Sequence, residues 1–429
     1  MKYQAIDKKL FIDNRAKFVK HLQGNSIAII NSNTELPENG DVHIKFKQNS
    51  SLFWLTGVIQ EKTMLILFPQ NIEKNFTEVL VILRPNEHLE KWEGHKLTPA
   101  EASNLSGIKT VIFLDQLDAL LQSWMHHCEN VYLNTNENDR MDGTLPRLDL
   151  NFINTLKSKY PLHNYKRAAP IFKELRAIKS NAEIALLQEA VNITHKAFER
   201  VCKFIKPNVW EYEIEAEITH EFLKNRATRH AYVCILASGD NARILHYVEN
   251  NQQCKNGDLI LMDFGAEYAN YCADLTRTIP VNGKFSKRQK EVYDACLAVH
   301  NYAKKILKPG KTWLEITALA EKEMENQLVK IGLLTKNDIK NQDPANPALK
   351  KYFYHGLGHH LGIDVHDLGT RNTPIKTGMV FTIEPGIYIQ EEKMGVRIEN
   401  DVWVSKTGNI DLFKKIPITT DEIEKVMKK

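Results

Sequence analysis

Residues 259–276 read LILMDFGAEYANYCADLT, and this stretch decides the fold of the second half of the chain. Its apolar run ends on Asp263, and a second carboxylate, Asp274, follows eleven residues later, after a segment that can turn. An Asp at a strand end is more often a turn or cap residue. A carboxylate that ends a buried strand is nevertheless costly unless something compensates its charge. The stretch therefore predicts two strands, paired as a hairpin, that bring two acidic side chains together.

The same pattern recurs near the C-terminus. The strand-like run 379–383 leads into Glu384, and the run 395–398 leads into Glu399. Four carboxylates gathered by the fold would repel one another unless divalent cations lay between them. Oxygen-rich ligation with one imidazole suits Mn²⁺, Co²⁺ or Zn²⁺. Bridging carboxylates can hold two such ions about 3.5–4 Å apart.

The imidazole is expected from residues 355–367, HGLGHHLGIDVHD. A single histidine here would be explained as a surface or core residue. Four histidines within twelve residues, among glycines that let the backbone approach closely, favour a site instead. These histidines are His355, His359, His360 and His366.

The length of 429 residues predicts two domains. Strand-like apolar runs at 26–30, 64–68 and 79–83 alternate with helical stretches, which indicates an α/β domain. From Ser180 the pattern of apolar residues changes to a helical one, and Ser180 and Glu183 directly before it have the spacing of a capping box. We therefore expect one domain at residues 1–170 and a second at 171–429.

Charge and hydropathy limit the classes of partner. A net charge of +4 is too small to indicate nucleic acid. No apolar run approaches the roughly 20 residues of a membrane span, and the first twenty residues lack a signal-peptide core. The six cysteines include no Cys-x-x-Cys pair. We expect a cytoplasmic, reduced protein that binds neither nucleic acid nor membrane.

These motifs resemble those of the pita-bread metallopeptidases, among which aminopeptidase P and prolidase are the nearest members. The resemblance implies an α/β N-terminal domain followed by an α+β pita-bread catalytic domain of the creatinase/aminopeptidase type. The segments that carry it are residues 263–274, 355–367, 382–386 and 396–399 in the second domain, with 46–50 and 53–57 in the first.

The resemblance also implies which residues would bind two divalent cations. Asp274 and Glu399 would bridge the two ions. Asp263 would complete one site, and His359 with Glu384 would complete the other. Mn²⁺ is the expected metal, with Co²⁺ and Zn²⁺ left open.

Further side chains match family residues that surround the substrate. His246 matches a histidine near the scissile bond, and His355 and His366 match two that contact the substrate and the reaction intermediate. Arg397 matches an arginine beside the site. The chain departs from the family at His360, where these enzymes commonly carry an aromatic residue, and this change could alter the wall of the pocket.

The implied activity is hydrolysis of the bond between an N-terminal residue and a following proline. Activated water would be the nucleophile, with Glu384 as its base and peptides with proline in second position as substrates. A homodimer or homotetramer is the implied assembly. Prolidase, which cleaves Xaa-Pro dipeptides, is the close alternative, although the length and N-terminal segment favour an aminopeptidase. A metal-free binding protein or a creatinase-like enzyme is a further alternative, but those relatives lose ligands that this chain retains.

Overall fold

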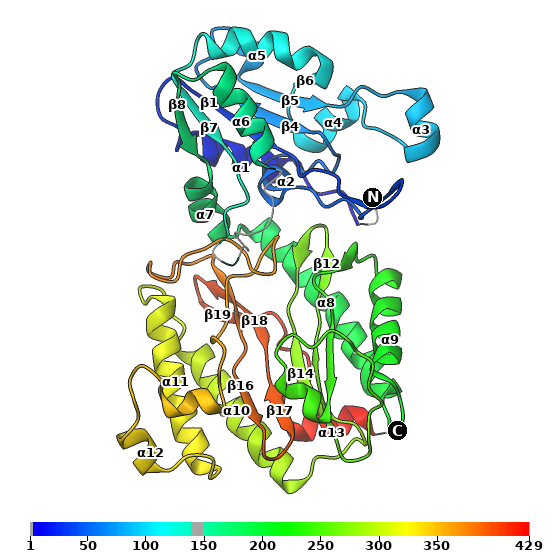
Figure 1. Ribbon diagram of the computed structural model, residues 1–429, viewed down its shortest axis with the longest axis vertical. Coiled ribbons are helices and arrows are strands. Elements are labelled where there is room, and N and C mark those ends of the chain that lie inside the picture. Colours follow the sequence, from blue (N-terminus) through cyan, green and yellow to red (C-terminus); the bar gives the residue numbers. More distant parts are fainter. Residues whose placement is uncertain (1–2, 139, 141–148, 429) are drawn as a thin grey trace. The chain divides into compact units, whose positions relative to one another are not determined.

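The computed structural model describes residues 3–138, 140 and 149–428, which form two compact units (Figure 1). One unit runs from Ala5 to Leu175, and the other runs from Arg176 onward and includes residues 3 and 4. None of the described helices is both long and apolar enough to cross a membrane. All six cysteines are buried and free of disulfides.

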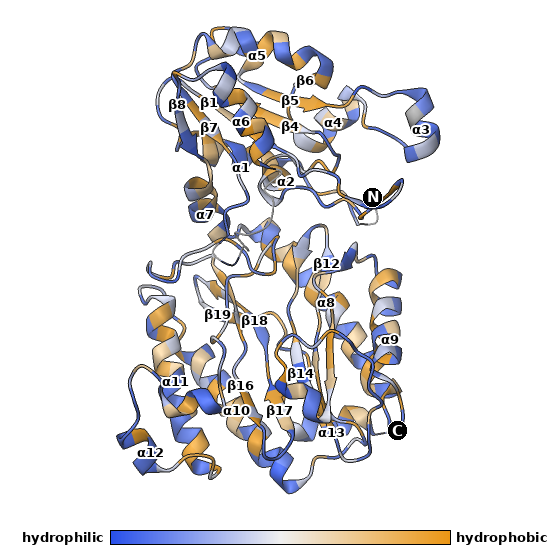
Figure 2. Cartoon of the chain, viewed as in Figure 1, coloured by the Kyte–Doolittle hydropathy of each residue, from blue (hydrophilic) through white to orange (hydrophobic). Residues whose placement is uncertain are grey.

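The N-terminal unit is built on a six-stranded mixed sheet in the order β6-β5-β4-β1-β7-β8. Strand β4 runs antiparallel to both of its neighbours, while β1, β7 and β8 are parallel, as are β5 and β6. The apolar runs predicted as strands are β1, β4 and β5, and Figure 2 shows their hydrophobic character. The strands are β1 (Ser26–Asn31), β4 (Met64–Leu67), β5 (Glu78–Ile82), β6 (Thr110–Phe113), β7 (Asn130–Leu133) and β8 (Asn164–Arg167), with a small ribbon of β2 (Pro37–Asn39) and β3 (Val42–His43).

Helices alternate with these strands, which confirms the α/β class of this unit. Apolar side chains of the sheet pack against α5 and α6 to form one buried core. The helices are α1 (Lys9–Val19), α2 (Ser50–Thr56), α3 (Glu87–Glu93), α4 (Pro99–Ser106), α5 (Leu117–Met125), α6 (Leu150–Lys159) and α7 (Ala169–Ala177), with short 3₁₀ turns η1 (Lys74–Phe76) and η2 (Leu114–Gln116).

The second unit begins its first long helix at the predicted capping box. Ser180 is the N-cap of α8, and its backbone N–H donates to the Glu183 carboxylate at 2.8 Å. Helix α8 packs on α9, and α10 packs on α11. The helices are α8 (Asn181–Phe204), α9 (Glu211–Lys224), α10 (Lys287–Ile306), α11 (Trp313–Lys330), α12 (Lys336–Lys340) and α13 (Thr420–Met427), with 3₁₀ turns η3 (Gly239–Arg243) and η4 (Ala348–Lys351).

The strands of this unit pair antiparallel in four small sheets that lie between the helices, which is the expected α+β arrangement (Figure 1). The sheet orders are β10-β11-β14, β13-β12-β9, β15-β18-β19 and β16-β17. Their bounds are β9 (Arg229–His230), β10 (Ile235–Ser238), β11 (Leu259–Asp263), β12 (Ala266–Tyr268), β13 (Tyr271–Cys272), β14 (Thr276–Pro280), β15 (Val380–Ile383), β16 (Gly386–Ile389), β17 (Met394–Arg397), β18 (Asn400–Ser405) and β19 (Gly408–Asp411).

The stretch 259–276 folds back on itself. Strand β11 pairs with β14, so that Asp263 lies opposite Thr276. Between them β12 and β13 form a tight hairpin whose turn residues, Ala269 and Asn270, both have positive φ. A two-residue turn of this handedness matches the natural twist of paired strands. Asp274, two residues before Thr276, is therefore brought back beside Asp263.

Candidate metal centre

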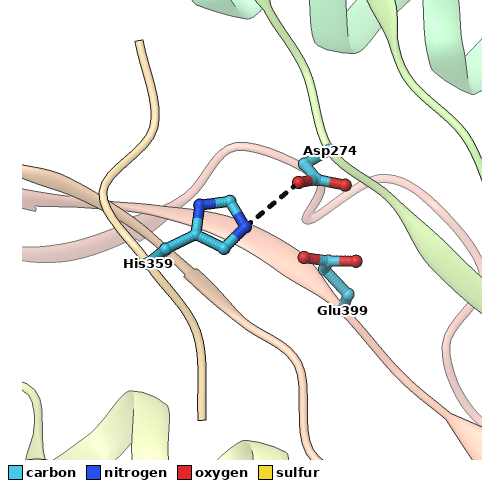
Figure 3. Close-up of side chains that lie close together, drawn as sticks. All are labelled: Asp274, His359 and Glu399. Carbon is cyan, nitrogen blue, oxygen red and sulfur yellow. Dashed lines mark ion pairs between the residues drawn. The ribbon is translucent and has the colours of Figure 1, made fainter. Parts of the chain in front are cut away.

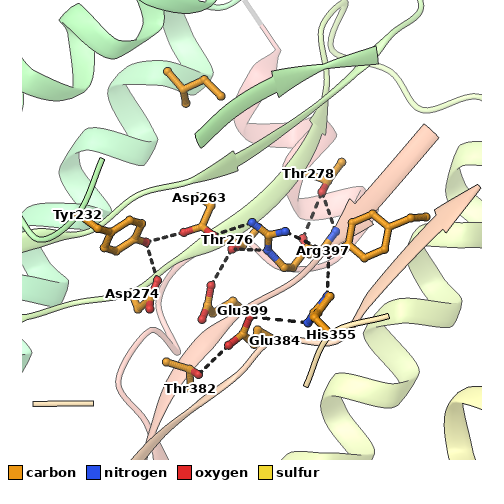
Figure 4. Close-up of polar contacts among 12 residues, drawn as sticks. Tyr232, Asp263, Asp274, Thr276, Thr278, His355, Thr382, Glu384, Arg397 and Glu399 are labelled. Carbon is orange, nitrogen blue, oxygen red and sulfur yellow. Dashed lines mark hydrogen bonds and ion pairs between the residues drawn. The ribbon is translucent and has the colours of Figure 1, made fainter. Parts of the chain in front are cut away.

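The two aspartates of the 259–276 stretch meet at one hydroxyl group. The Tyr232 hydroxyl lies 2.5 Å from Oδ1 of Asp263 and 2.5 Å from Oδ1 of Asp274 (Figure 4). Both aspartates are buried. A phenol has a single proton and can donate to only one acceptor at a time, so this pair of carboxylates needs further positive charge.

The two glutamates come from the ends of other strands. Glu384 follows β15, and Glu399 lies between β17 and β18. Glu399 is 1% exposed and accepts a hydrogen bond of 2.6 Å from the Thr276 hydroxyl. Glu384 accepts one of 3.2 Å from the Thr382 hydroxyl. The structure thus brings all four predicted carboxylates into one region (Figure 4).

His359 supplies the imidazole, and its orientation is fixed by the backbone. Its Nδ1 lies 3.0 Å from the carbonyl oxygen of His360, so Nδ1 carries the proton and Nε2 is left as the ligand atom. Nε2 lies 3.4 Å from Asp274 and 3.5 Å from Glu384. Asp274, His359 and Glu399 each offer one ligand atom within 4.8 Å of the others (Figure 3).

The electrostatics of the site favour a bound cation. Burial, followed by the charges of Asp274, Glu384 and Asp263, raises the pKa of Glu399 well above its usual range. Burial also raises the pKa of Asp263 and raises that of Glu384 to about 7. Arg397 donates to Asp263 at 2.6 Å and offsets one negative charge. Four carboxylates and one imidazole, buried together, fit two divalent cations by charge and by donor type.

Three predicted side chains lie around this cluster. Burial lowers the pKa of His355 to about 3, so its ring is neutral. Its Nδ1 donates to the Gly356 carbonyl oxygen at 2.8 Å, and its Nε2 accepts from the Tyr388 hydroxyl at 2.8 Å. The ring of His366 stands perpendicular to that of His359, with centroids 4.3 Å apart. His246 is exposed and is close enough for its charge to lower the pKa of His355.

Arg397 joins the two sides of the site. Besides Asp263, it donates to the Tyr388 hydroxyl at 3.0 Å and to the Thr276 hydroxyl at 3.3 Å (Figure 4). The Tyr388 hydroxyl therefore accepts from Arg397 while it donates to His355. The arginine predicted to lie beside the site is thus a hydrogen-bonding partner of a carboxylate in it.

His360, the departure from the family pattern, lies in a buried aromatic stack. Its ring centroid is 4.3 Å from that of Phe381, which stacks on Trp313 at 4.5 Å. A Cβ added at Gly369 would lie 2.0 Å from the His360 ring, so that glycine makes room for the imidazole. Burial lowers the pKa of His360 to about 4, which keeps the ring neutral. An effect of His360 on the pocket wall stays a prediction.

Buried ion pairs fix the segment that carries His359 and His366. Asp367 lies 2.6 Å from Arg176 and 3.0 Å from Lys179, and all three side chains are at most 4% exposed. The backbone N–H of Asp367 donates to the His360 carbonyl oxygen, which also accepts from His359. The charges near the start of α8 therefore hold the loop on which both histidines sit.

Several groups at the site were not predicted from the sequence. Tyr232 and Tyr388 are hydroxyl partners in segments without any motif. Thr276 lies in the decisive stretch, and its place opposite Asp263 could have been found from the strand register. Arg277 is fully buried, and it donates to the backbone carbonyl oxygens of Thr276 at 2.9 Å and Glu399 at 2.8 Å.

The chain matches two protein-family models and is similar to known proteins. Residues 185–406 match the model of metallopeptidase family M24, and residues 11–132 match that of the aminopeptidase P N-terminal domain. The chain is 33% identical to the Xaa-Pro aminopeptidase of Escherichia coli (strain K12), over 98% of each sequence.

Solved structures are similar over nearly the whole chain. The structure of aminopeptidase P from E. coli with the inhibitor Pro-Leu has a TM-score of 0.87 at 32% identity, covering 99% of both chains. The Pseudomonas aeruginosa aminopeptidase PepP has a TM-score of 0.88 at 30% identity, covering 99% of this chain and 98% of that one.

Proposed function

This chain belongs to metallopeptidase family M24 and carries an aminopeptidase P N-terminal domain, and from that premise we propose how its residues carry out the family's chemistry. It is a metallo-aminopeptidase that hydrolyses the bond between an N-terminal residue and a following proline. The similarity to Xaa-Pro aminopeptidases covers both domains, and the observation that carries the function is the buried cluster of Asp274, His359 and Glu399. Neither prolidase nor a metal-free binding protein gains support from these comparisons.

We assign residues 1–170 to the N-terminal domain and 171–429 to the catalytic domain. In the catalytic domain, Asp274 and Glu399 would be shared by two divalent cations. Asp263 would belong to one cation, and His359 with Glu384 would belong to the other. The shared position of Asp274, which faces His359 on one side and Asp263 through Tyr232 on the other, supports this division.

The cations supply Lewis acidity toward water and toward the peptide carbonyl group. Manganese is the proposed metal because the donor set is dominated by carboxylate oxygens, and cobalt or zinc would also be accepted. Elemental analysis of protein purified without added metal tests this choice. A stoichiometric metal outside these three would contradict it.

Glu384 is the proposed general base. Its carboxylate would take a proton from attacking water and return it to the leaving nitrogen. Its carboxylate lies 4.0 Å from His355, which places it on the side of the cluster where substrate would enter beside that histidine. The proline nitrogen must gain a proton to leave as an amine when the C–N bond breaks, and Glu384 would deliver the proton that it took from water.

Three histidines are proposed to position the substrate. His366 stabilises the negative charge that develops on the carbonyl oxygen, because its ring stands beside His359. Neutral His355, fixed through Tyr388 and lying beside Glu384, presents its ring to the substrate without adding charge to the site. His246 lies near the scissile bond, and Arg397 holds Asp263 in its binding orientation.

Comparing a Xaa-Pro-Yaa tripeptide with a Xaa-Pro dipeptide tests this function. The metal-loaded enzyme is expected to release the first residue from the tripeptide. Hydrolysis of the dipeptide alone would show that the chain is a prolidase.

We also propose that the protein is cytoplasmic and forms a homodimer or homotetramer. Light scattering at several protein concentrations would reveal this assembly. A monomer at every concentration would contradict that assembly.

A further inference from the structure

The connection between β10 and β11 (residues 239–258) carries His246, and many of its side chains are exposed to solvent. His246 is exposed, and its apolar neighbours Ile244 and Val248 are 55% and 46% exposed. An exposed connection of this length keeps one conformation only if particular contacts hold it. The place of His246 therefore depends on what fixes this connection to the rest of the domain.

One buried carboxylate binds the chain at three places along this connection, at Ser238 directly before it and at Tyr247 and Gln252 within it. Glu211, the first residue of α9, is 0% exposed. Its Oε1 accepts from the backbone N–H and the hydroxyl of Ser238, both at 2.7 Å. Its Oε2 accepts from the Tyr247 hydroxyl at 2.8 Å and from the backbone N–H of Gln252 at 2.9 Å. Hydrogen bonds to a charged carboxylate are about twice as strong as neutral ones.

The same connection packs against β17, one of the strands that lead to the metal centre. A Cβ added at Gly395 of β17 would lie 2.3 Å from the carbonyl oxygen of Ala242, so the two backbones touch. The ring of Tyr247 lies in a buried apolar cluster with Ala242 and Tyr388. Tyr388 is the residue whose hydroxyl donates to His355. Movement of Tyr247 would therefore displace Tyr388 and His355 beside the metal centre, as well as His246.

We propose that Glu211 is a positioning residue for catalysis, which fixes the 238–252 connection and so places His246 at the scissile bond. This inference rests on the proposed function, because the role of His246 belongs to it. Glutamine cannot replace Glu211, although it has the same shape. Each carboxylate oxygen faces one backbone N–H, from Ser238 or from Gln252. Whichever way a glutamine amide turned, its NH₂ group would face one of them, and that N–H would lose its acceptor.

The test is a double-mutant cycle on the metal-loaded enzyme with a Xaa-Pro-Yaa peptide. Glu211→Gln and Tyr247→Phe are each expected to lower kcat/KM by about 10- to 100-fold, the scale of a misplacement of ~1 Å. In a His246→Ala background the same changes are expected to lower kcat/KM by at least about fivefold less, because the residue they position is gone and only the effect through Tyr388 remains. Glu213→Gln changes an exposed glutamate of the same helix turn, which accepts from the backbone N–H of Trp210, and glutamine can accept the same bond, so this variant is expected to leave kcat/KM unchanged.

A second measurement keeps the test independent of the peptidase assay. Hydrogen exchange of the backbone amides in 239–252 is expected to speed up in Glu211→Gln and not in Glu213→Gln, with the metal content of both unchanged. Equal losses of kcat/KM with and without His246 would overturn the proposal, as would unchanged exchange in the connection. A wild-type enzyme that left the tripeptide intact would instead overturn the proposed function, while the exchange result would still report on Glu211.

Discussion

Replacing Asp367 by asparagine removes the one charge that Arg176 and Lys179 share. Asp367 and Lys179 have side chains only 1% exposed, so water cannot solvate Lys179 once Asp367 is replaced, whereas Arg176 keeps its ion pair with Asp364. Removing one partner of a buried ion pair costs about 3–5 kcal/mol. For a domain of this size each kcal/mol corresponds to about 2–4 °C, so the Tm of the catalytic unit is expected to fall by about 6–20 °C.

The assay is thermal unfolding followed by a signal assigned to the catalytic unit, with two control variants. Asp421→Asn breaks the exposed pair with Lys290 and is expected to leave Tm nearly unchanged. Adding Lys179→Met to Asp367→Asn restores the balance of buried charge, so the double variant is expected to lose less Tm than the two single variants together. If Asp367→Asn unfolded at the same temperature as Asp421→Asn, the buried cluster would not stabilise the domain.

The same variant carries a pH prediction. Burial alone raises the pKa of Asp367, but the charges of Lys179 and Arg176 outweigh burial and hold the pKa below its usual value. A carboxyl whose folded pKa is lowered stabilises the protein above its unfolded pKa of about 3.9, and this contribution is lost as the pH falls through the folded value. The difference in Tm between wild type and Asp367→Asn should therefore be constant from pH 7 to about pH 5 and shrink below about pH 4. A difference that widened in acid would show the sign to be wrong.

Three further outcomes follow from the site. Glu384→Gln removes an anionic ligand and should bind metal more weakly, so it is assayed in excess Mn²⁺ with its metal content confirmed by elemental analysis. It should then lose about 10²–10⁴-fold in kcat, and wild-type turnover with both metals bound would exclude Glu384 as the base. Gly265→Ala should lose metal and activity together, because the new Cβ would lie 1.7 Å from the carbonyl oxygen of Ala273, next to Asp274, and normal metal content would refute this steric argument. Chelation should abolish turnover and lower Tm, and Mn²⁺ should restore both, whereas full activity in excess chelator would exclude a metal mechanism.

The sequence predicted the parts of the site that obey a local rule. Asp263, Glu384 and Glu399 could be chosen because each ends an apolar run, where an uncompensated charge would be costly. Three strands of the N-terminal sheet, β1, β4 and β5, were recognisable for a similar reason, as short apolar runs between polar turns. The roles of individual ligands came from the family resemblance and remain proposals.

The remaining contacts could not be predicted because they join segments far apart in the chain. Tyr232 contacts Asp274 across 42 residues, and Arg176 contacts Asp367 across 191. No local pattern marks such a partner, since it is selected by the packing of whole elements. Glu211 could not be predicted either. From the sequence it resembles an ordinary glutamate in the first turn of a helix, and only the fold brings the connection that it binds beside it.

The guanidinium of Arg277 has a consequence for the site when its metal is exchanged. It joins the strand after Asp274 to the segment carrying Glu399 by donating to the backbone carbonyl oxygens of Thr276 and Glu399, and these hydrogen bonds are made by the protein chain alone. The spacing between the two halves of the site is therefore a property of the protein chain alone. A protein built in this way is expected to keep the two halves of the site at the same spacing when its metal ions are removed and replaced.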